Sequence, residues 1–169
     1  MMILGIDPGM TGALALLTQD GELVRVWDIP SQPKAKGKGN EVNGYLLADI
    51  FTDIVGVAKE HGHKIEVIME QVGPQPRDSR PAAFKFGDSF GVIRMGVCCH
   101  YLPLRLVTPG VWKKYHSLLK KDKTASRMLA ISKWPDQRDQ FIRVKDADRA
   151  EAALIGDFGR QLAGWKQDV

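Results

Sequence analysis

The sequence predicts a single α/β domain built on a mixed five-stranded sheet with helices packed against it. Three observations predict this fold class: three short apolar stretches separated by turns open the chain, two more apolar stretches follow later, and amphipathic segments with helical spacing lie between and after them. With 169 residues, of which 44% are hydrophobic and 26% charged, the chain suits one compact domain over residues 1–169 with a substantial core.

The N-terminal part predicts an antiparallel opening to the sheet. Residues 2–6, 12–17 and 23–28 are rich in aliphatic side chains, and the Gln-Asp-Gly run at 19–21 is typical of a hairpin turn. Residues 31–41 hold one proline, two glycines and three lysines, a composition that contributes little to a core. We expect a mobile basic loop there.

The rest of the chain alternates predicted helices with two further strands. Residues 65–69 and 104–107 have the character of buried strands, and a helix before each of them favours a parallel arrangement in the sheet. Apolar residues at helical spacing, with caps and stops at their ends, predict helices over residues 42–61, 81–99, 109–115, 123–134 and 146–162. This order of elements describes a mixed sheet covered by helices.

Composition excludes several classes of protein. No apolar stretch is long enough for a membrane-spanning helix, and the first residues lead into a Gly-Asp-Pro-Gly turn rather than into a signal-peptide cleavage site. Cys98 and Cys99 are adjacent in an apolar run, which favours burial as small hydrophobic side chains. We therefore expect a cytoplasmic protein that does not act at a membrane.

Positive charge is concentrated in two blocks of the sequence. Residues 113–127 hold six lysines and arginines against one acid, Asp122, and residues 33–40 hold three lysines and no acid, in a chain with a net charge of +4. Either block alone is equally compatible with a solvated surface. Together with clustered acids, the two blocks favour nucleic acid as the partner.

Four carboxylates predict a metal-dependent nuclease site. Asp7 and Glu70 each follow an apolar strand, while Asp148 and Glu151 stand three residues apart on one face of the last helix. Phosphodiester hydrolysis needs an activated water and charge relief on the leaving oxygen, which two divalent ions about 3.5–4 Å apart supply. Mg²⁺ prefers carboxylate oxygens, and cations offset the repulsion within such a cluster. We interpret all four acids as catalytic ligands of two Mg²⁺ ions, with Mn²⁺ as a substitute.

Each carboxylate also has a structural interpretation that the sequence leaves open. Asp7 could cap the turn that follows it, Glu70 could be an ordinary residue at a strand end, and acids in a first helical turn are favoured by the macrodipole. Asp146 lies two residues before Asp148, about 200° away on a helix, so both face one site only if Asp146 precedes the helix. We assign Asp146 to the N-cap and keep it as an alternative metal ligand.

Four motifs resemble those of RuvC-like Holliday junction resolvases. They are GIDPGMTGALALL at residues 5–17, VIMEQV at 67–72, VTPGVWKK at 107–114 and DADRAEAALIG at 146–156, and they span nearly the whole chain in the order of that family. The Ala-Glu-Ala-Ala-Leu run is similar to the phage branch. The resemblance implies a ribonuclease H-like fold, a homodimer and Mg²⁺-dependent cutting of branched DNA to leave 5′-phosphate ends, in the host cytoplasm if the chain is phage-encoded.

The chain departs from the family pattern at one ligand position. RuvC-like enzymes usually carry aspartate where Glu151 stands, and glutamate reaches one methylene further, which leaves the preference between Mg²⁺ and Mn²⁺ open. The family also presents aromatic residues to the junction from the segment after the second catalytic acid. The nearest aromatic residues here are Phe84, Phe86 and Phe90, each of which could equally pack in the core. Gly87 and Gly91 allow close approach and are candidates for either a dimer contact or packing within the chain.

Ten basic residues are expected to contact DNA. Contacts between such side chains and phosphates add salt-dependent affinity without reading sequence. They are Lys34, Lys36, Lys38, Arg77, Arg80, Lys113, Lys114, Lys120, Lys121 and Lys123. Trp112 is expected to anchor its helix, and His100 and His116 to be incidental.

The leading hypothesis is a metal-dependent, structure-selective DNA endonuclease that resolves Holliday junctions and also cuts other branched DNA such as forks and flaps. A second hypothesis is a catalytically inactive junction-binding or structural protein, but such proteins usually lose a ligand and all four acids are present here. A third is a nucleotide-binding protein, because residues 7–12 are similar to the phosphate-binding hairpin of actin-like ATPases and sugar kinases. Those proteins need two such domains, for which this chain is too short.

Overall fold

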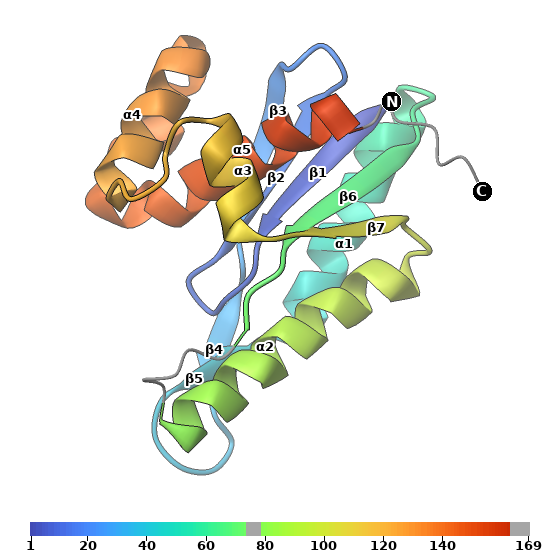
Figure 1. Cartoon of the computed structure of the whole chain (residues 1–169). Helices are drawn as coiled ribbons and strands as arrows, with labels where there is room; N and C mark the ends of the chain where they lie inside the picture. Colours follow the sequence, from blue (N-terminus) through green and yellow to red (C-terminus); the bar gives the residue numbers. More distant parts are fainter. Residues whose placement is uncertain (74–78, 163–169) are drawn as a thin grey trace, which may run out of the picture.

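The computed structural model describes residues 1–73 and 79–162, and its core is a five-stranded mixed sheet (Figure 1). The strands are β1 Met2–Asp7, β2 Ala13–Thr18, β3 Leu23–Asp28, β6 Ile65–Glu70 and β7 Leu104–Val107. Their order across the sheet is β3-β2-β1-β6-β7; β2 is antiparallel to both β1 and β3, whereas β6 is parallel to both β1 and β7. The predicted fold class is confirmed.

The predicted helices are all found, with ends that differ from the prediction by at most two residues. The α-helices are α1 Gly44–Glu60, α2 Arg80–Cys99, α3 Pro109–Tyr115, α4 Lys123–Lys133 and α5 Ala147–Leu162, and the 3₁₀ helices are η1 Pro135–Gln140 and η2 Val144–Asp146. Side chains of Asn43, Ser79 and Asp122 accept hydrogen bonds from the first amides of α1, α2 and α4. Among the described residues, no helix has both the length and the apolar character needed to cross a bilayer.

Different helices cover the two faces of the sheet. Side chains of β1 alternate between them, since Ile3 packs in one core and Leu4 in the other. The Ile3 core contains residues of α3, α4 and α5, with Trp112 and Phe141 among its largest side chains. The Leu4 core contains residues of α1 and α2, including Phe51. The sheet is therefore the middle layer of three (Figure 1).

Helix α5 crosses β1 at close range because glycines meet at the crossing. A Cβ atom placed on Gly5 would lie 2.1 Å from the carbonyl oxygen of Ala152 and 2.4 Å from the amide nitrogen of Gly156. Neither backbone group can move away cheaply, so a larger residue at position 5 would push the helix off the sheet. The crossing brings the start of α5 beside the carboxyl end of β1.

The segment over residues 31–41 corrects the prediction of a loop along its whole length. Its ends form a two-stranded antiparallel hairpin, β4 Ser31–Pro33 and β5 Asn40–Val42, and Gln32 donates a side-chain hydrogen bond to Glu41. Pro33 is compatible with this short ladder because it is the last residue of β4. The loop prediction holds only for the tip, residues 34–39, where Gly37 and Gly39 have positive φ.

The two cysteines also differ from expectation. Cys98 and Cys99 end α2 as free thiols, and both are exposed rather than buried. The buried side of this part of α2 is provided by Val97 instead, which is fully inaccessible to solvent. The apolar run that contains the cysteines is thus amphipathic and not a core segment.

Candidate active site

The carboxyl ends of two neighbouring strands hold the first two acids. Asp7 is the last residue of β1 and Glu70 the last residue of β6, and the two strands are parallel with Ile6 opposite Met69. Because parallel neighbours end at the same edge of a sheet, the two carboxylates lie at one edge. Asp148 and Glu151 occupy the first turns of α5, whose start lies beside this edge.

The four predicted acids form one electrostatic cluster in a largely buried setting. Asp7, Glu70 and Glu151 are 9%, 6% and 5% exposed. Burial raises the pKa of Asp7 well above its ordinary value, and the charges of Glu70, Asp148 and Glu151 raise it further. A buried carboxyl group with three like charges around it makes this edge of the sheet a candidate functional site.

Two lysines and two neutral donors contact the acids. Lys123 Nζ lies 2.5 Å from Asp148 Oδ1, and Lys113 Nζ lies 3.3 Å from Glu151 Oε1. Burial acts to lower the pKa of Lys123, but the hydrogen bond and charge of Asp148 outweigh it and the pKa is raised. The neutral donors are the indole of Trp112, on Glu70, and the hydroxyl of Ser126, on Glu151.

Opposing effects act on the pKa of Glu70. Burial raises its pKa, while the hydrogen bond from Trp112 and the positive charge of Lys113 act in the opposite direction without cancelling the increase. Helix α3 supplies both of these partners. The short helix therefore forms one wall of the site.

Asp146 lies outside the cluster. Its side chain accepts hydrogen bonds from the backbone amide of Arg143 at 2.8 Å and from the guanidinium Nε of the same residue at 3.0 Å. Burial would raise its pKa, but these bonds to Arg143 lower it. Asp146 precedes α5, as expected for an N-cap, yet its carboxylate binds Arg143. The charges of Asp148 and Glu151, the pair that the spacing favoured, act on the pKa of Asp7, whereas Asp146 is not among the groups that do.

The other predicted DNA contacts occupy several surfaces. Lys34, Lys36 and Lys38 lie in the tip of the β4–β5 hairpin, Arg80 is the exposed first residue of α2, and Arg77 lies outside the described residues. Lys114 on α3 and Lys120 and Lys121 in the loop before α4 are exposed. Of the basic residues expected to contact phosphate, the structure thus places Lys113 and Lys123 directly against the acids.

Several aromatic and histidine residues behave as packing groups. Phe86 and Phe90 are half-buried with ring centroids 6.3 Å apart, whereas Phe84 is 78% exposed. His116 Nε2 lies 2.9 Å from the carbonyl oxygen of Leu154, and His100 Nδ1 lies 2.8 Å from that of Gly96. The histidines therefore have backbone partners, and His116 also lies 4.0 Å from Asp157 rather than against the four acids of the site. Phe84 is the aromatic side chain of the three that is open to a ligand.

Sequence reasoning missed the two neutral donors. Trp112 was expected only to anchor its helix; it is fully buried and also contacts Glu70, which is 42 positions away in the chain. Ser126 was not singled out. Its one local signal is a position three residues after Lys123, which puts both side chains on the same face of α4.

The donor set fits a divalent cation by its chemistry. Carboxylate oxygens are what Mg²⁺ prefers, and four acids in a largely buried cluster need positive charge. In the arrangement of the described residues, no three Asp, Glu, His or Cys side chains converge closely enough to hold an ion. Asp148 and Glu151 instead contact lysine ammonium groups, which supply positive charge at the same cluster. Binding of ions would require Lys123 to withdraw from Asp148 and Lys113 to withdraw from Glu151.

Comparison with known proteins identifies the fold. No family model matches the sequence, and no curated protein matches it. Among solved structures, Thermus thermophilus RuvC is similar with a TM-score of 0.64 and 17% identity, over 96% of this chain and 97% of that chain. T. thermophilus RuvC in complex with a Holliday junction substrate is similar with a TM-score of 0.58 and 17% identity, over 96% of each chain. The chain therefore has a RuvC-like, ribonuclease H-like fold.

Proposed function

We propose that this protein is a metal-dependent, structure-selective DNA endonuclease that cuts Holliday junctions and other branched DNA such as forks and flaps. The observation that carries the proposal is the buried cluster of Asp7, Glu70, Asp148 and Glu151. The fold supports it, because the similar RuvC structures include one with a Holliday junction substrate.

The four acids would hold two Mg²⁺ ions, with Mn²⁺ as a substitute. Such ions activate a water for attack on phosphorus and stabilise charge on the leaving oxygen. Asp7 and Glu70 are fixed by the strand ends, whereas Asp148 and Glu151 come from the helix that crosses β1. A site assembled from both strands and a helix keeps its ligands in a defined mutual geometry.

Positive side chains around the acids are placed to hold the DNA backbone. Lys113 and Lys123 reach the cluster itself, and exposed lysines follow on the same α3–α4 unit. The lysines of the β4–β5 hairpin form a second basic region near α2, where a Cβ atom added at Gly39 would lie 3.8 Å from Lys85 Nζ. These contacts would bind branched DNA through phosphates without reading sequence.

A homodimer would explain the exposed stripe of α2. Phe84 and Met95 are 78% and 60% exposed, and between them Gly87 and Gly91 face open space, since an added Cβ would meet nothing within 4 Å. Small residues between large apolar ones allow two helices to approach closely. In sedimentation experiments we expect the wild type to be a dimer and Gly91→Arg to be a folded monomer. A wild-type monomer would contradict the dimer.

Cleavage of defined DNA substrates tests the proposed function. Labelled four-way junction, fork, flap and linear duplex are incubated with the wild type, Asp7→Asn and Asp20→Asn in Mg²⁺ and in Mn²⁺. Asp20 is an exposed acid in the turn between β2 and β3, at the opposite end of the sheet from Asp7, and serves as the matched control. We expect branched substrates to be cut by the wild type and the control, and at least about 100-fold more slowly by Asp7→Asn, beyond the 10–100-fold typical of residues that only orient a ligand.

The substrate pattern separates the alternatives. Paired symmetric nicks confined to the four-way junction indicate a resolvase in the strict sense, and cutting of forks and flaps indicates a broader debranching nuclease. Junction binding without cutting in either metal would contradict the proposal and favour a structural junction-binding protein. Unchanged cleavage by folded Asp7→Asn would show that the mechanism is wrong.

A further inference from the structure

Trp112 places a hydrogen-bond donor on one carboxylate oxygen of Glu70. The side chain is fully buried on α3, and its indole Nε1 lies 2.7 Å from Glu70 Oε1. Lys113 Nζ lies 5.0 Å from the centroid of the same ring, which helps to hold the indole in place. A buried donor with a single acceptor at this distance fixes both partners, because breaking the bond would leave polar atoms unsatisfied.

Ser126 provides the equivalent contact at the second glutamate. It is 2% exposed on α4, and its hydroxyl lies 3.1 Å from Glu151 Oε1. Lys113 Nζ approaches the same oxygen at 3.3 Å. Each glutamate is thus held through its Oε1 atom by a residue from α3 or α4. Among the described residues, no hydrogen bond or ion pair involves the Oε2 atom of either side chain.

We propose that Trp112 and Ser126 are positioning residues that restrict Glu70 and Glu151 to one-oxygen coordination through Oε2, and that they thereby make the site select Mg²⁺ and Mn²⁺ over Ca²⁺. The inference rests on the proposed function, because it takes the acid cluster to be a metal site. It goes beyond that function by assigning the metal preference to two residues that are not ligands.

The chemistry of the ions connects this geometry to selectivity. Mg²⁺ requires a compact octahedral arrangement and is bound by single carboxylate oxygens, whereas Ca²⁺ takes six to eight oxygens and commonly binds a carboxylate through both. A donor on Oε1 occupies one lone pair of that oxygen and weakens it as a metal ligand, which disfavours two-oxygen binding. Glutamate has one more rotatable bond than aspartate, so its carboxylate group has more freedom for a hydrogen bond to restrict.

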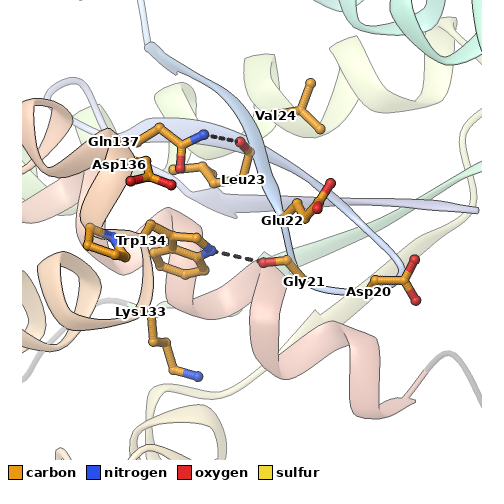
Figure 2. A pocket seen from close by; sticks show the side chains of 10 residues that line it. Asp20, Gly21, Glu22, Leu23, Val24, Lys133, Trp134, Asp136 and Gln137 are labelled. Carbon is orange, nitrogen blue, oxygen red and sulfur yellow. Dashed lines mark hydrogen bonds between the residues drawn. The ribbon is translucent and has the colours of Figure 1, made fainter.

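Two substitutions remove the donors while keeping most of the packing. Trp112→Phe retains an aromatic ring without the N–H group, and Ser126→Ala removes the hydroxyl alone. The matched control is Trp134→Phe: the Trp134 indole donates to the carbonyl oxygen of Gly21 at 2.9 Å, in a pocket lined by the β2–β3 turn and the end of α4 (Figure 2). This control loses the same chemical group at the opposite end of the sheet from Asp7.

Isothermal titration calorimetry with Mn²⁺ and with Ca²⁺ on each folded protein tests the proposal without relying on cleavage. We expect the ratio of Mn²⁺ affinity to Ca²⁺ affinity to fall about 10–100-fold in Trp112→Phe and in Ser126→Ala, the range typical of residues that orient metal ligands. The ratio should be unchanged in Trp134→Phe. A purely structural role would lower stability, measured by thermal unfolding, without changing this ratio.

The outcomes separate the inference from the proposed function. If the wild type binds Mn²⁺ and Asp7→Asn does not, but both donor variants keep the wild-type ratio, the positioning role is wrong and the metal site stands. A change in the ratio in only one variant would restrict the role to that donor and overturn the shared mechanism. If the wild type binds no Mn²⁺, the metal site and the inference fail together.

Discussion

Two buried aspartates, Asp157 and Asp7, have opposite surroundings. Asp157 on α5 is 3% exposed and has cations on both oxygens: Arg160 Nη1 at 2.6 Å and Lys133 Nζ at 2.8 Å, the latter an ion pair outside hydrogen-bond geometry. Asp7 is 9% exposed and has three carboxylates around it. The difference teaches that a buried charge with matched partners can be explained by structure alone, whereas a buried charge among like charges makes its surroundings a candidate functional site.

Among the substitutions considered, removal of the Asp157 charge should change the free energy of unfolding most. Asp157→Asn would leave Lys133 and Arg160 without their anion, and a fully buried pair broken in this way costs 3–5 kcal/mol. Because the two basic side chains are 34% and 22% exposed, we expect a smaller loss of about 2–3 kcal/mol in the free energy of unfolding, measured by denaturant titration. Wild-type stability in Asp157→Asn would show that the paired cluster is not structural.

Addition of Mg²⁺ should stabilise the cluster of acids around Asp7. An ion that binds only the folded state adds about 1.4 kcal/mol when its free concentration is ten times the dissociation constant. We expect the wild-type melting temperature to rise with Mg²⁺ and to fall back on chelation, while Asp7→Asn shows neither change. The Asp20→Asn control should respond like the wild type. An equal response in Asp7→Asn would place the ion elsewhere.

Substitution of Asp7 should stabilise the metal-free protein. The raised pKa of Asp7 means that the folded state loses stability as pH rises through that pKa, whereas asparagine does not titrate. In chelator near neutral pH we therefore expect Asp7→Asn to gain about 1 kcal/mol in the free energy of unfolding, a typical exchange of function for stability. The gain should vanish below the ordinary aspartate pKa of 3.8. A loss near neutral pH would contradict the electrostatic account.

Substitution of a third aspartate, Asp28, should lower the free energy of unfolding slightly, whereas substitution of Asp7 should raise it. Asp28 is bound by the guanidinium of Arg149, which lowers its pKa, so its contribution to stability exists above the ordinary pKa and disappears as pH falls through the lowered one. Because the Asp28 side chain is 62% exposed, we expect Asp28→Asn to lose less than about 1 kcal/mol near neutral pH. Chemical unfolding should show this loss shrinking at acid pH. A loss that persists there would exclude the ion pair as its cause.

The sequence predicted what local periodicity and spacing control. Helix and strand positions follow from the repeat of apolar residues, and Asp7 and Glu70 meet because they end neighbouring parallel strands. The three-residue spacing of Asp148 and Glu151 identified the acids of α5 that act on Asp7. These features depend on neighbours in sequence or on one rule of sheet geometry.

Other features depend on contacts that local patterns do not encode. The bond from Trp112 to Glu70 joins residues 42 positions apart, and the bond from Ser126 to Glu151 joins residues 25 positions apart. The approach of Lys113 and Lys123 to the acids depends on how α3 and α4 pack against α5. In the β4–β5 hairpin, composition predicted a loop because prolines and glycines disfavour strands, yet a three-residue ladder tolerates them.

Anomalous diffraction from crystals soaked in Mn²⁺ would test most directly whether the carboxylate cluster is a metal centre. The account predicts Mn²⁺ peaks bounded by Asp7, Glu70 and the acids of α5, with Lys123 and Lys113 withdrawn from Asp148 and Glu151. Occupied Mn²⁺ sites elsewhere, with the lysine contacts of Asp148 and Glu151 intact at saturating metal, would contradict it.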